Sequence, residues 1–504
     1  MKIIPRIIML ACILPLTACS VFGTKPVSNQ GHPNIVFILT DDMAYADLAY
    51  MPKTTELIGD QGAAFDNFLI SMALCCPSRA CILRGQYPHN TGILANRPPN
   101  GGFEKFHADG LEESTFAVWL QEAGYDTALI GKYMNGYPEL PDVKYIPPGW
   151  TEWYSPAGGN PYDQYNYSLN ENGKIVEYGS GPEDYGTDVY SKITLDFIQR
   201  SIAADHAFFA LVTVYAPHEP STPAPRHADL FPDLKLPRSP SFNEEDVSDK
   251  PLQYSGNPVL DDEYIAEMGS LYRKRIQSLQ AVDEMIASIV ETLKSSGQLD
   301  NTYIFFTSDN GYHMGEHRLP EGKDTAFEED IRVPLLVYGP GIVPGGRIDA
   351  LAGNIDLAPT FAELAGVTPP DFVDGRSLVP FLLGGNPSTW REAYFLQRGK
   401  FGKAPVSLTP PAFLPDNQNG LLEPEDSPRN RTPFLPFIGI RTADYTYLEY
   451  KYGEIELYDL RADPYQLQNI ASTADPSLLA MLHAWLTGLK GCKADACRTA
   501  EMQP

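Results

Sequence analysis

Two pairs of oxygen-bearing side chains follow apolar segments of the sequence. Asp41–Asp42 comes directly after the apolar run 34–40, and Asp309–Asn310 comes just after the run 302–307. Adjacent carboxylates repel one another unless a cation lies between them. Three carboxylates and one amide, without imidazole or thiolate at equivalent positions, favour Ca²⁺, or less readily Mg²⁺, over zinc. Either pair alone is typical of a helix cap or turn, but two pairs at predicted strand ends indicate a metal site.

A second reactive feature is the segment 75–85, with the sequence CCPSRACILRG. Its three cysteines, Cys75, Cys76 and Cys81, lie too close together for an obvious disulfide framework. Two further cysteines, Cys492 and Cys497, lie near the C-terminus and could form a small disulfide if the protein is exported. The crowded cysteines therefore need a chemical explanation.

The elements that must position these residues alternate between strands and helices. Buried parallel strands are predicted from their apolar runs, and the clearest helix covers 262–293, where apolar residues recur at helical spacing. This alternation predicts an α/β fold with a mostly parallel, doubly wound sheet flanked by helices. In such sheets, ligands bind beyond the carboxyl ends of the strands. The predicted strands cover 34–40, 127–130, 207–214, 302–307 and 333–338.

Two proline-rich segments interrupt this pattern. The segment 217–240 follows a strand and is expected to wall the mouth of an active site, whereas 405–436 is interpreted as a connection. Beyond the connection, three short β segments and a helix over 476–489 predict a small C-terminal α+β subdomain. We expect the catalytic domain to cover 34–395 and the subdomain, with its connection, to cover 396–504.

The charge of the 504-residue chain limits its partners. Its formal net charge is -26, from 64 acidic and 38 basic residues. No broad positive surface is available to release counterions from a nucleic-acid backbone, so DNA and RNA are excluded as expected partners. An anionic substrate would need a local pocket with its own Lys, Arg, His or metal ion.

The N-terminus is typical of an exported bacterial lipoprotein. Basic residues precede an apolar run too short to span a membrane, which predicts a signal peptide over 1–18. The run ends in Leu16-Thr17-Ala18-Cys19, which resembles a lipobox and predicts lipidation of Cys19. A polar tether over 19–33 would follow. We expect an outer-membrane protein, facing the periplasm or the cell surface, whose contact with the membrane is this lipid anchor alone.

The segment 75–85 matches the sulfatase signature C-x-P-S-R followed by a short helix and a glycine. Together with Asp41–Asp42 and Ser308–Gly311, it makes the chain similar to type I sulfatases of the alkaline phosphatase superfamily over about 34–469. The resemblance implies an alkaline phosphatase-like fold. It also implies that a separate formylglycine-generating enzyme oxidises Cys75 to formylglycine, whose hydrate acts as the nucleophile. Cys76 and Cys81 are interpreted as packing residues.

The same resemblance assigns roles to the charged residues. Asp41, Asp42, Cys75, Asp309 and Asn310 would hold the metal ion. Arg79 would hold the nucleophile, Lys132 would contact both nucleophile and sulfate, and Lys323 would bind sulfate oxygens. His218 would touch the sulfate or protonate the leaving oxygen.

One departure from many arylsulfatases concerns a histidine. Those enzymes carry G-K-W-H, whereas this chain has Gly131-Lys132-Tyr133-Met134-Asn135. N-acetylglucosamine-6-sulfatases and heparan endosulfatases share this form, the C-C-P-S-R doublet and a D-[NH]-G-Y-H stretch like Asp309 to His313. His313 is therefore expected to replace the imidazole as general acid or sulfate ligand, or else to be a structural turn residue. His317 is a weaker candidate, and His89 could line the pocket or cap a helix.

These observations predict a sulfatase that hydrolyses sulfate esters of a carbohydrate. The first choice of substrate is 6-O-sulfated N-acetylglucosamine or a related polysaccharide sugar. Two alternatives remain: a phosphonate or phosphodiester hydrolase of the same superfamily, and a lipoprotein that binds sulfated glycans without turnover.

Overall fold

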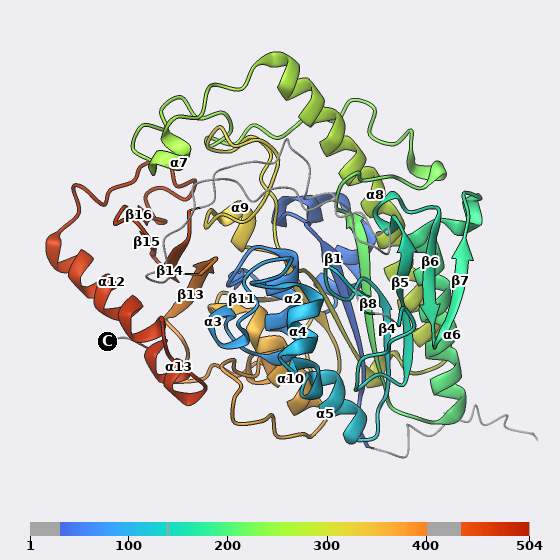
Figure 1. Ribbon diagram of the computed structural model, residues 1–504. Coiled ribbons are helices and arrows are strands. Elements are labelled where there is room, and N and C mark those ends of the chain that lie inside the picture. Colours follow the sequence, from blue (N-terminus) through green and yellow to red (C-terminus); the bar gives the residue numbers. More distant parts are fainter. Residues whose placement is uncertain (1–30, 139, 141, 401–434, 503–504) are drawn as a thin grey trace, which may run out of the picture.

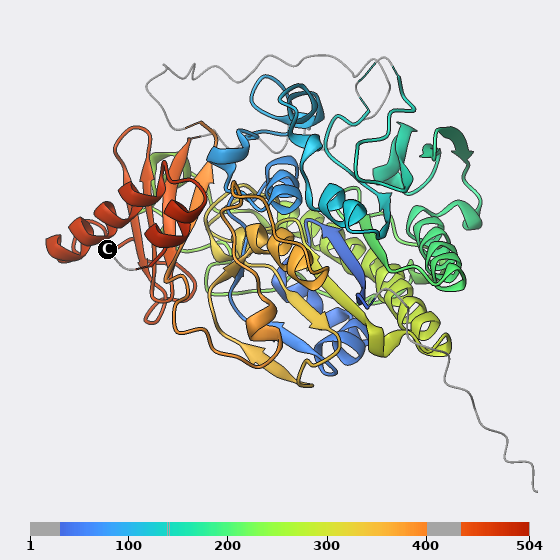
Figure 2. The same ribbon diagram turned by 90° about the horizontal axis from the view of Figure 1, so that it is seen from below.

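The computed structural model describes residues 31–138, 140, 142–400 and 435–502. A ten-stranded sheet with helices on both faces makes up most of the molecule, and a smaller antiparallel sheet lies at its C-terminal side (Figure 1 and Figure 2). This arrangement agrees with the predicted α/β fold and its small C-terminal subdomain. The predicted signal peptide, Cys19 and most of the proline-rich connection lie outside the described residues. Among the described helices, none has the length and apolar character needed to cross a membrane.

Five adjacent parallel strands form the centre of the large sheet, in the order β9-β1-β8-β4-β5. Their side chains are apolar and mostly buried, because helices cover both faces. The bounds are β1 Asn34–Asp41, β4 Asp126–Gly131, β5 Glu152–Gly159, β8 Phe208–Pro217 and β9 Thr302–Ser308. The outer strands are β2 Ala63–Phe65, β6 Tyr167–Glu171, β7 Lys174–Tyr178, β10 Leu335–Tyr338 and β11 Gly346–Ile348.

The prediction of a parallel strand over 333–338 is wrong in its direction. Strand β10 pairs antiparallel with both β9 and β2, and Leu335 at its start lies opposite Thr307 at the end of β9. A parallel strand would need a crossover connection that returns the chain to the end of the sheet where β9 begins. The connection from β9 contains only one short helix, α9 (Glu328–Ile331). This connection brings the chain back into the sheet at the same end where β9 leaves it.

Two helical layers cover the sheet. Helices α2 (Cys75–Arg84), α5 (Phe116–Glu122) and α10 (Leu357–Leu364) pack on the face that Phe37 occupies. Helices α6 (Gly186–Ala204) and α8 (Asp262–Ser295) cover the face of Ile38 (Figure 1). The position of α8 confirms the predicted helix over 262–293. The two apolar layers fix the strand ends against one another.

The C-terminal sheet has four antiparallel strands in the order β13-β14-β15-β16. It begins at Ala393, just before the predicted boundary, and helix α12 packs against it. The disulfide between Cys492 and Cys497 closes the turn between α12 and α13. The bounds are β13 Ala393–Arg398, β14 Phe437–Thr442, β15 Tyr445–Tyr450, β16 Ile455–Asp459, α12 Pro476–Leu489 and α13 Asp495–Ala500.

Candidate active site

The predicted metal-ligating residues meet at the carboxyl edge of the sheet. Strands β1 and β9 are paired in register up to Thr40 and Ser308, so Asp41–Asp42 and Asp309–Asn310 leave the sheet side by side. All four of these side chains are buried. Asp42 has a φ of 66°, a left-handed conformation that non-glycine residues rarely adopt and that turns the chain sharply after β1. Adjacent strand ends thus bring two distant sequence segments into one cluster.

Cys75 is the first residue of helix α2 and points into this cluster. Its Sγ atom lies 3.5 Å from Asp41 Oδ1 and 3.9 Å from Asp42 Oδ1, and its side chain is fully buried. The positive end of the helix dipole therefore lies at the nucleophile position, where it favours negative charge. The helix ends at Gly85, whose φ of 66° suits glycine, and a Cβ there would crowd Val373.

Arg79 lies one helical turn after Cys75 and ties the strand ends together. Its Nε donates to Asp309 Oδ2 at 2.8 Å, and its Nη1 donates to the Lys132 carbonyl at 2.9 Å and to Thr213 Oγ1 at 2.7 Å. The carboxylates of Asp309 and Asp41 raise the pKa of Arg79 although burial opposes this. Arg79 therefore stays charged and fixes α2 against β4, β8 and β9.

Three further cationic or ionisable side chains converge on the same carboxylates. Lys132 Nζ donates to Asp41 Oδ2 at 2.7 Å. Lys323 Nζ donates to Asp42 Oδ1 at 2.7 Å and lies 2.8 Å from Cys75 Sγ. The imidazole of His218 places Nε2 3.4 Å from Asp42 Oδ2. The cluster thus combines acidic ligands with groups that can bind an anion.

The carboxylates of the cluster differ in their proton affinity. Burial raises the pKa of Asp41, but the charges of Lys132, His218 and Arg79 outweigh it and hold this pKa below its usual value. Burial and the nearby Asp41 carboxylate raise the pKa of Asp309, although Arg79 opposes them. The surroundings therefore favour the ionised form of Asp41 more than that of Asp309.

The donor set fits a hard divalent cation. The oxygen Oδ1 of Asn310 is buried without a hydrogen-bond partner, while its amide nitrogen donates to Asp42 Oδ1 at 2.7 Å. Asp41, Asp42, Cys75 and His218 each place one potential ligand atom within 4.8 Å of the others. Carboxylate and amide oxygens are preferred ligands of Ca²⁺ and Mg²⁺. A cation here would satisfy the Asn310 oxygen and add positive charge beside the buried carboxylates.

The remaining predicted histidines lie beside the cluster or outside it. His313 is buried, its Nδ1 bonds Asp330 at 2.9 Å, and the charge of Asp330 raises the pKa of His313 against the effect of burial. Its catalytic role remains a prediction. His317 bonds Glu244 and stacks on Phe327.

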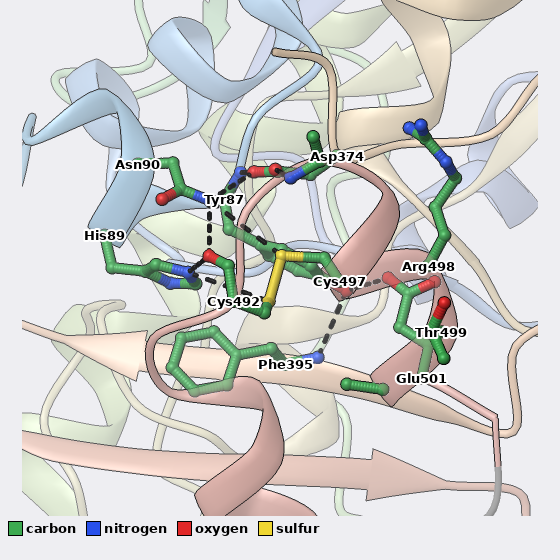
Figure 3. Close-up of a disulfide and its surroundings, with 12 residues drawn as sticks. Tyr87, His89, Asn90, Asp374, Phe395, Cys492, Cys497, Arg498, Thr499 and Glu501 are labelled. Atoms are coloured by element: carbon green, nitrogen blue, oxygen red, sulfur yellow. Dashed lines mark hydrogen bonds between the residues drawn. A yellow bond between two sulfur atoms is a disulfide. The ribbon is translucent and has the colours of Figure 1, made fainter. Parts of the chain in front are cut away.

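His89 lies beside the C-terminal disulfide instead of the nucleophile. Its Nε2 contacts the carbonyl of Cys492 at 3.0 Å (Figure 3), and its ring packs against those of Tyr87 and Phe395. These contacts join the segment after α2 to the C-terminal turn. His89 is therefore better explained as a structural residue at this junction than as part of the substrate pocket.

Sequence analysis missed two residues that support the site. Thr213 on β8 accepts from Arg79, and Arg275 on α8 donates to the backbone carbonyls of Asp42 and Pro217. Arg275 belongs to the buried stripe of α8, between Tyr272 and Leu279 in helical spacing. A charged residue within an apolar stripe was the signal that could have revealed it. The hydroxyl of Thr213 left no such signal, because threonine is common in strands.

Comparisons with known proteins agree with these features. The family described as Sulfatase matches residues 33–367. Human N-acetylglucosamine-6-sulfatase is 36% identical over 97% of this chain and 89% of the human protein. The N-acetylglucosamine-6-O-sulfatase of Bacteroides thetaiotaomicron is 29% identical over 92% of this chain and 87% of the relative.

Solved structures share the fold. A protein in complex with its substrate D-glucosamine-2-N,6-O-disulfate has a TM-score of 0.72 and 26% identity, over 90% of this chain and 97% of that one. A phosphonate monoester hydrolase from Silicibacter pomeroyi has a TM-score of 0.67 and 23% identity, over 90% and 93% of the two chains. The second likeness concerns the architecture alone.

Proposed function

This chain belongs to the sulfatase family, and we propose that it removes the 6-O-sulfate of N-acetylglucosamine or a related polysaccharide sugar. Two relatives that cover most of this chain are named N-acetylglucosamine-6-sulfatase and N-acetylglucosamine-6-O-sulfatase, and both names describe hydrolysis of a sulfate ester on an amino sugar. The observation that carries the assignment is the position of Cys75. Its Sγ lies at a helix N-terminus between Lys323 and the carboxylates of Asp41 and Asp42.

The proposal includes maturation of Cys75 to formylglycine by a separate enzyme. In the structure, the sulfur of Cys75 stands in for the oxygen of the matured residue. When both groups are present, the hydrated aldehyde supplies a nucleophilic oxygen and Ca²⁺ supplies positive charge beside it. Asp41, Asp42, Asp309, Asn310 and residue 75 would hold the cation.

The lysines provide the anion-binding part of the site. Lys132 and Lys323 approach the carboxylates from different segments, and Lys323 also reaches the position of the nucleophile. Their charges would bind sulfate oxygens and stabilise negative charge that develops in the transition state. A local pair of ammonium groups offsets the long-range repulsion between the acidic protein and an anionic substrate.

His218 is the group best placed to move a proton. Its Nδ1 lies 2.9 Å from the carbonyl of Glu219, which can only accept, so Nδ1 carries hydrogen. The other nitrogen, Nε2, faces Asp42 and is the atom that can gain or lose a proton. We assign His218 Nε2 to protonation of the departing sugar oxygen, with His313 as the alternative.

The sugar specificity rests on relatives. Human N-acetylglucosamine-6-sulfatase and the Bacteroides N-acetylglucosamine-6-O-sulfatase both cover most of this chain. The substrate bound in one of the solved structures, D-glucosamine-2-N,6-O-disulfate, is likewise a glucosamine with a sulfate ester on O6. These likenesses support a glucosamine-type sugar with a sulfate on O6.

The cellular location is also part of the proposal. The predicted signal peptide and lipobox support an exported lipoprotein anchored through Cys19, which would place the enzyme where extracellular glycans enter a bacterium. Globomycin-sensitive processing and detergent partitioning of the full chain test this anchor. A mature protein that begins before Cys19, or that carries no lipid, contradicts it.

The central experiment combines mass spectrometry with substrate comparison. The residue-75 peptide of the purified protein is expected to carry the formylglycine mass, and Ca²⁺-loaded protein is expected to release sulfate from N-acetylglucosamine-6-sulfate. The 3-O-sulfated isomer and an aryl phosphodiester serve as matched comparisons. Faster turnover of the phosphodiester would favour the phosphonate or phosphodiester hydrolase alternative. Binding of a sulfated oligosaccharide by matured protein without sulfate release would favour a glycan-binding protein.

A further inference from the structure

The loop that carries Lys323 is held in place by side-chain and backbone contacts instead of a helix or strand. Gly322 exchanges two backbone hydrogen bonds with His313, at 2.8 and 3.0 Å. Thr325 donates both its backbone N–H and its hydroxyl to Asp330 Oδ2, at 2.9 and 2.6 Å. Between these anchors lie Lys323 and the residue that follows it, Asp324.

That residue, Asp324, has two unusual properties. Its φ of 76° lies in the left-handed region, which is unfavourable for a residue with a side chain. Its side chain is also only 8% exposed, although burial of an acid is costly without a partner. A strained, buried residue directly after an active-site lysine requires a contact that stabilises it.

The C-terminal sheet supplies this contact. Arg398, the last residue of β13, is 4% exposed, and its Nε lies 3.2 Å from Asp324 Oδ2. The adjacent Lys323 reaches Asp42 at 2.7 Å and Cys75 Sγ at 2.8 Å. One ion pair therefore connects the subdomain to the loop whose lysine contacts the nucleophile position.

We propose that the Arg398–Asp324 ion pair is a positioning device that holds Lys323 in the active site. The inference rests on the proposed function, because it assigns Lys323 to the sulfate and the nucleophile. The long lysine side chain has many rotamers, and its ammonium is useful only when its backbone is fixed. The C-terminal subdomain thus contributes to hydrolysis without touching the substrate.

A second ion pair across the same interface provides a matched control. Arg441 on β14 is 5% exposed and pairs with Glu328, with Nε 2.9 Å from Oε1. Glu328 begins α9, after the Thr325 anchor. Both pairs join the C-terminal sheet to the segment after β9. Of the two arginines, Arg398 is the one that pairs with Asp324, the residue beside Lys323.

The test is a double-mutant cycle in the full, matured protein. Arg398→Gln and Asp324→Asn are each expected to lower kcat/KM about 10- to 100-fold, since small displacements of a positioned group have effects of this size. The double variant should lose no more than either single variant, because both remove one contact. Arg398→Lys should recover part of the loss, whereas Arg441→Gln should lower thermal stability with kcat/KM unchanged. Asp324→Asn, nearly isosteric, serves as the main variant if Arg398→Gln fails to fold.

A crystal structure of Asp324→Asn separates this inference from the proposed function. Lys323 Nζ is expected to leave its contacts with Asp42 and residue 75. If the lysine stays in place, or if Arg398 and Asp324 variants lose activity additively or no more than Arg441→Gln, the positioning role is wrong. Absence of sulfate release by the wild-type protein would instead refute the proposed function and leave the structural readout intact.

Discussion

Two buried ion clusters of this protein use the same residue types for different purposes. The first is the catalytic cluster around Cys75. The second, which we term the junction cluster, consists of Tyr87, Asp356, Arg376, Arg391 and Glu501 and joins the segment after α2 to the C-terminal helix α13 (Figure 3 shows Tyr87 and Glu501). Comparison of the two distinguishes a structural network from a binding site.

The junction cluster satisfies its carboxylates with protein donors. Arg391 donates through both Nη atoms to Asp356, and its Nε lies 3.1 Å from Glu501 Oε2 as an ion pair without a hydrogen bond. Arg376 approaches the same Glu501 oxygen at 3.1 Å, and the Tyr87 hydroxyl donates to the other oxygen at 2.5 Å. Both acids are fully buried, and the donors on every carboxylate oxygen make their burial tolerable.

The catalytic cluster lacks this completeness. Its Asn310 Oδ1 is buried without a partner, and the carboxylates of Asp41 and Asp309 have pKa values displaced in opposite directions. Lys323, which contacts the carboxylate of Asp42, also contacts the nucleophile position at Cys75. The difference teaches that an unpartnered buried oxygen set among carboxylates and lysines distinguishes the catalytic cluster from a network whose carboxylate oxygens all accept from protein donors.

The strongest test of this comparison is removal of the nucleophile. Cys75→Ala is expected to reduce sulfate release at least about 10⁴-fold, because the covalent route is lost while binding groups remain. Cys76→Ala, a buried neighbour, is expected to retain most of the activity. Initial rates on N-acetylglucosamine-6-sulfate measure both. The opposite pattern would show that the nucleophile is misassigned.

Removal of the metal should affect only the catalytic cluster. Dialysis against a chelator is expected to abolish turnover, and Ca²⁺ should restore it better than Mg²⁺ because the oxygen-rich site suits the larger ion. At about 100 times its Kd, Ca²⁺ should add about 2.7 kcal/mol to the free energy of unfolding. Thermal unfolding with and without Ca²⁺ measures this gain. Asn310→Ala should diminish it, and an undiminished gain would place the ion elsewhere.

The catalytic cluster was largely predictable because its parts are local. Asp41–Asp42, Asp309–Asn310 and the segment 75–85 each follow or begin a single element, and parallel strands bring their ends to one edge. Short sequence motifs were therefore sufficient to predict which residues gather at this edge of the sheet. The direction of β10 was not predictable in this way, because an apolar run does not reveal whether the preceding connection crosses the sheet.

Contacts between distant segments were not predictable. Arg391, Asp356 and Glu501 each occur singly in the sequence, without spacing that relates them, and only tertiary packing brings them together. Arg398 likewise follows an ordinary strand pattern, yet it reaches Asp324 across the subdomain interface. Such pairs depend on the relative placement of whole elements, about which a single sequence carries little information.

Disruption of the junction cluster should affect stability and leave the chemistry intact. Arg391→Met leaves Asp356 buried without its cation and removes one of the two arginines beside Glu501, and a loss of about 3–5 kcal/mol in the free energy of unfolding is expected. Turnover per folded molecule should change little. Urea denaturation and activity of the folded fraction measure the two effects. Arg347→Met removes an exposed pair with Asp66 and should cost about 1 kcal/mol or less. Equal losses of unfolding free energy in Arg391→Met and Arg347→Met would show that burial does not make an ion pair more important for stability.

The smallest effect on the free energy of unfolding is expected for a buried acid whose partners are phenols instead of cations. This effect should depend on pH. Glu456 in β16 accepts from the hydroxyls of Tyr450 and Tyr458, and burial raises its pKa from the usual 4.5 to about 7. The folded protein therefore holds this proton more tightly than the unfolded chain does. The resulting stabilisation is complete below pH 4.5 and is lost as the pH rises through 7.

Substitution of Glu456 by glutamine tests this linkage. Glu456→Gln keeps an oxygen for the phenols and removes the titration, so its stability relative to the wild type should improve by about 1–3 kcal/mol between pH 5 and pH 8. Urea denaturation at both pH values measures the difference. Asp246→Asn, at an exposed position, provides the control with little pH-dependent gain. A constant difference between Glu456→Gln and wild type at the two pH values would mean that phenol donors stabilise a buried carboxylate as fully as the arginines of the junction cluster do.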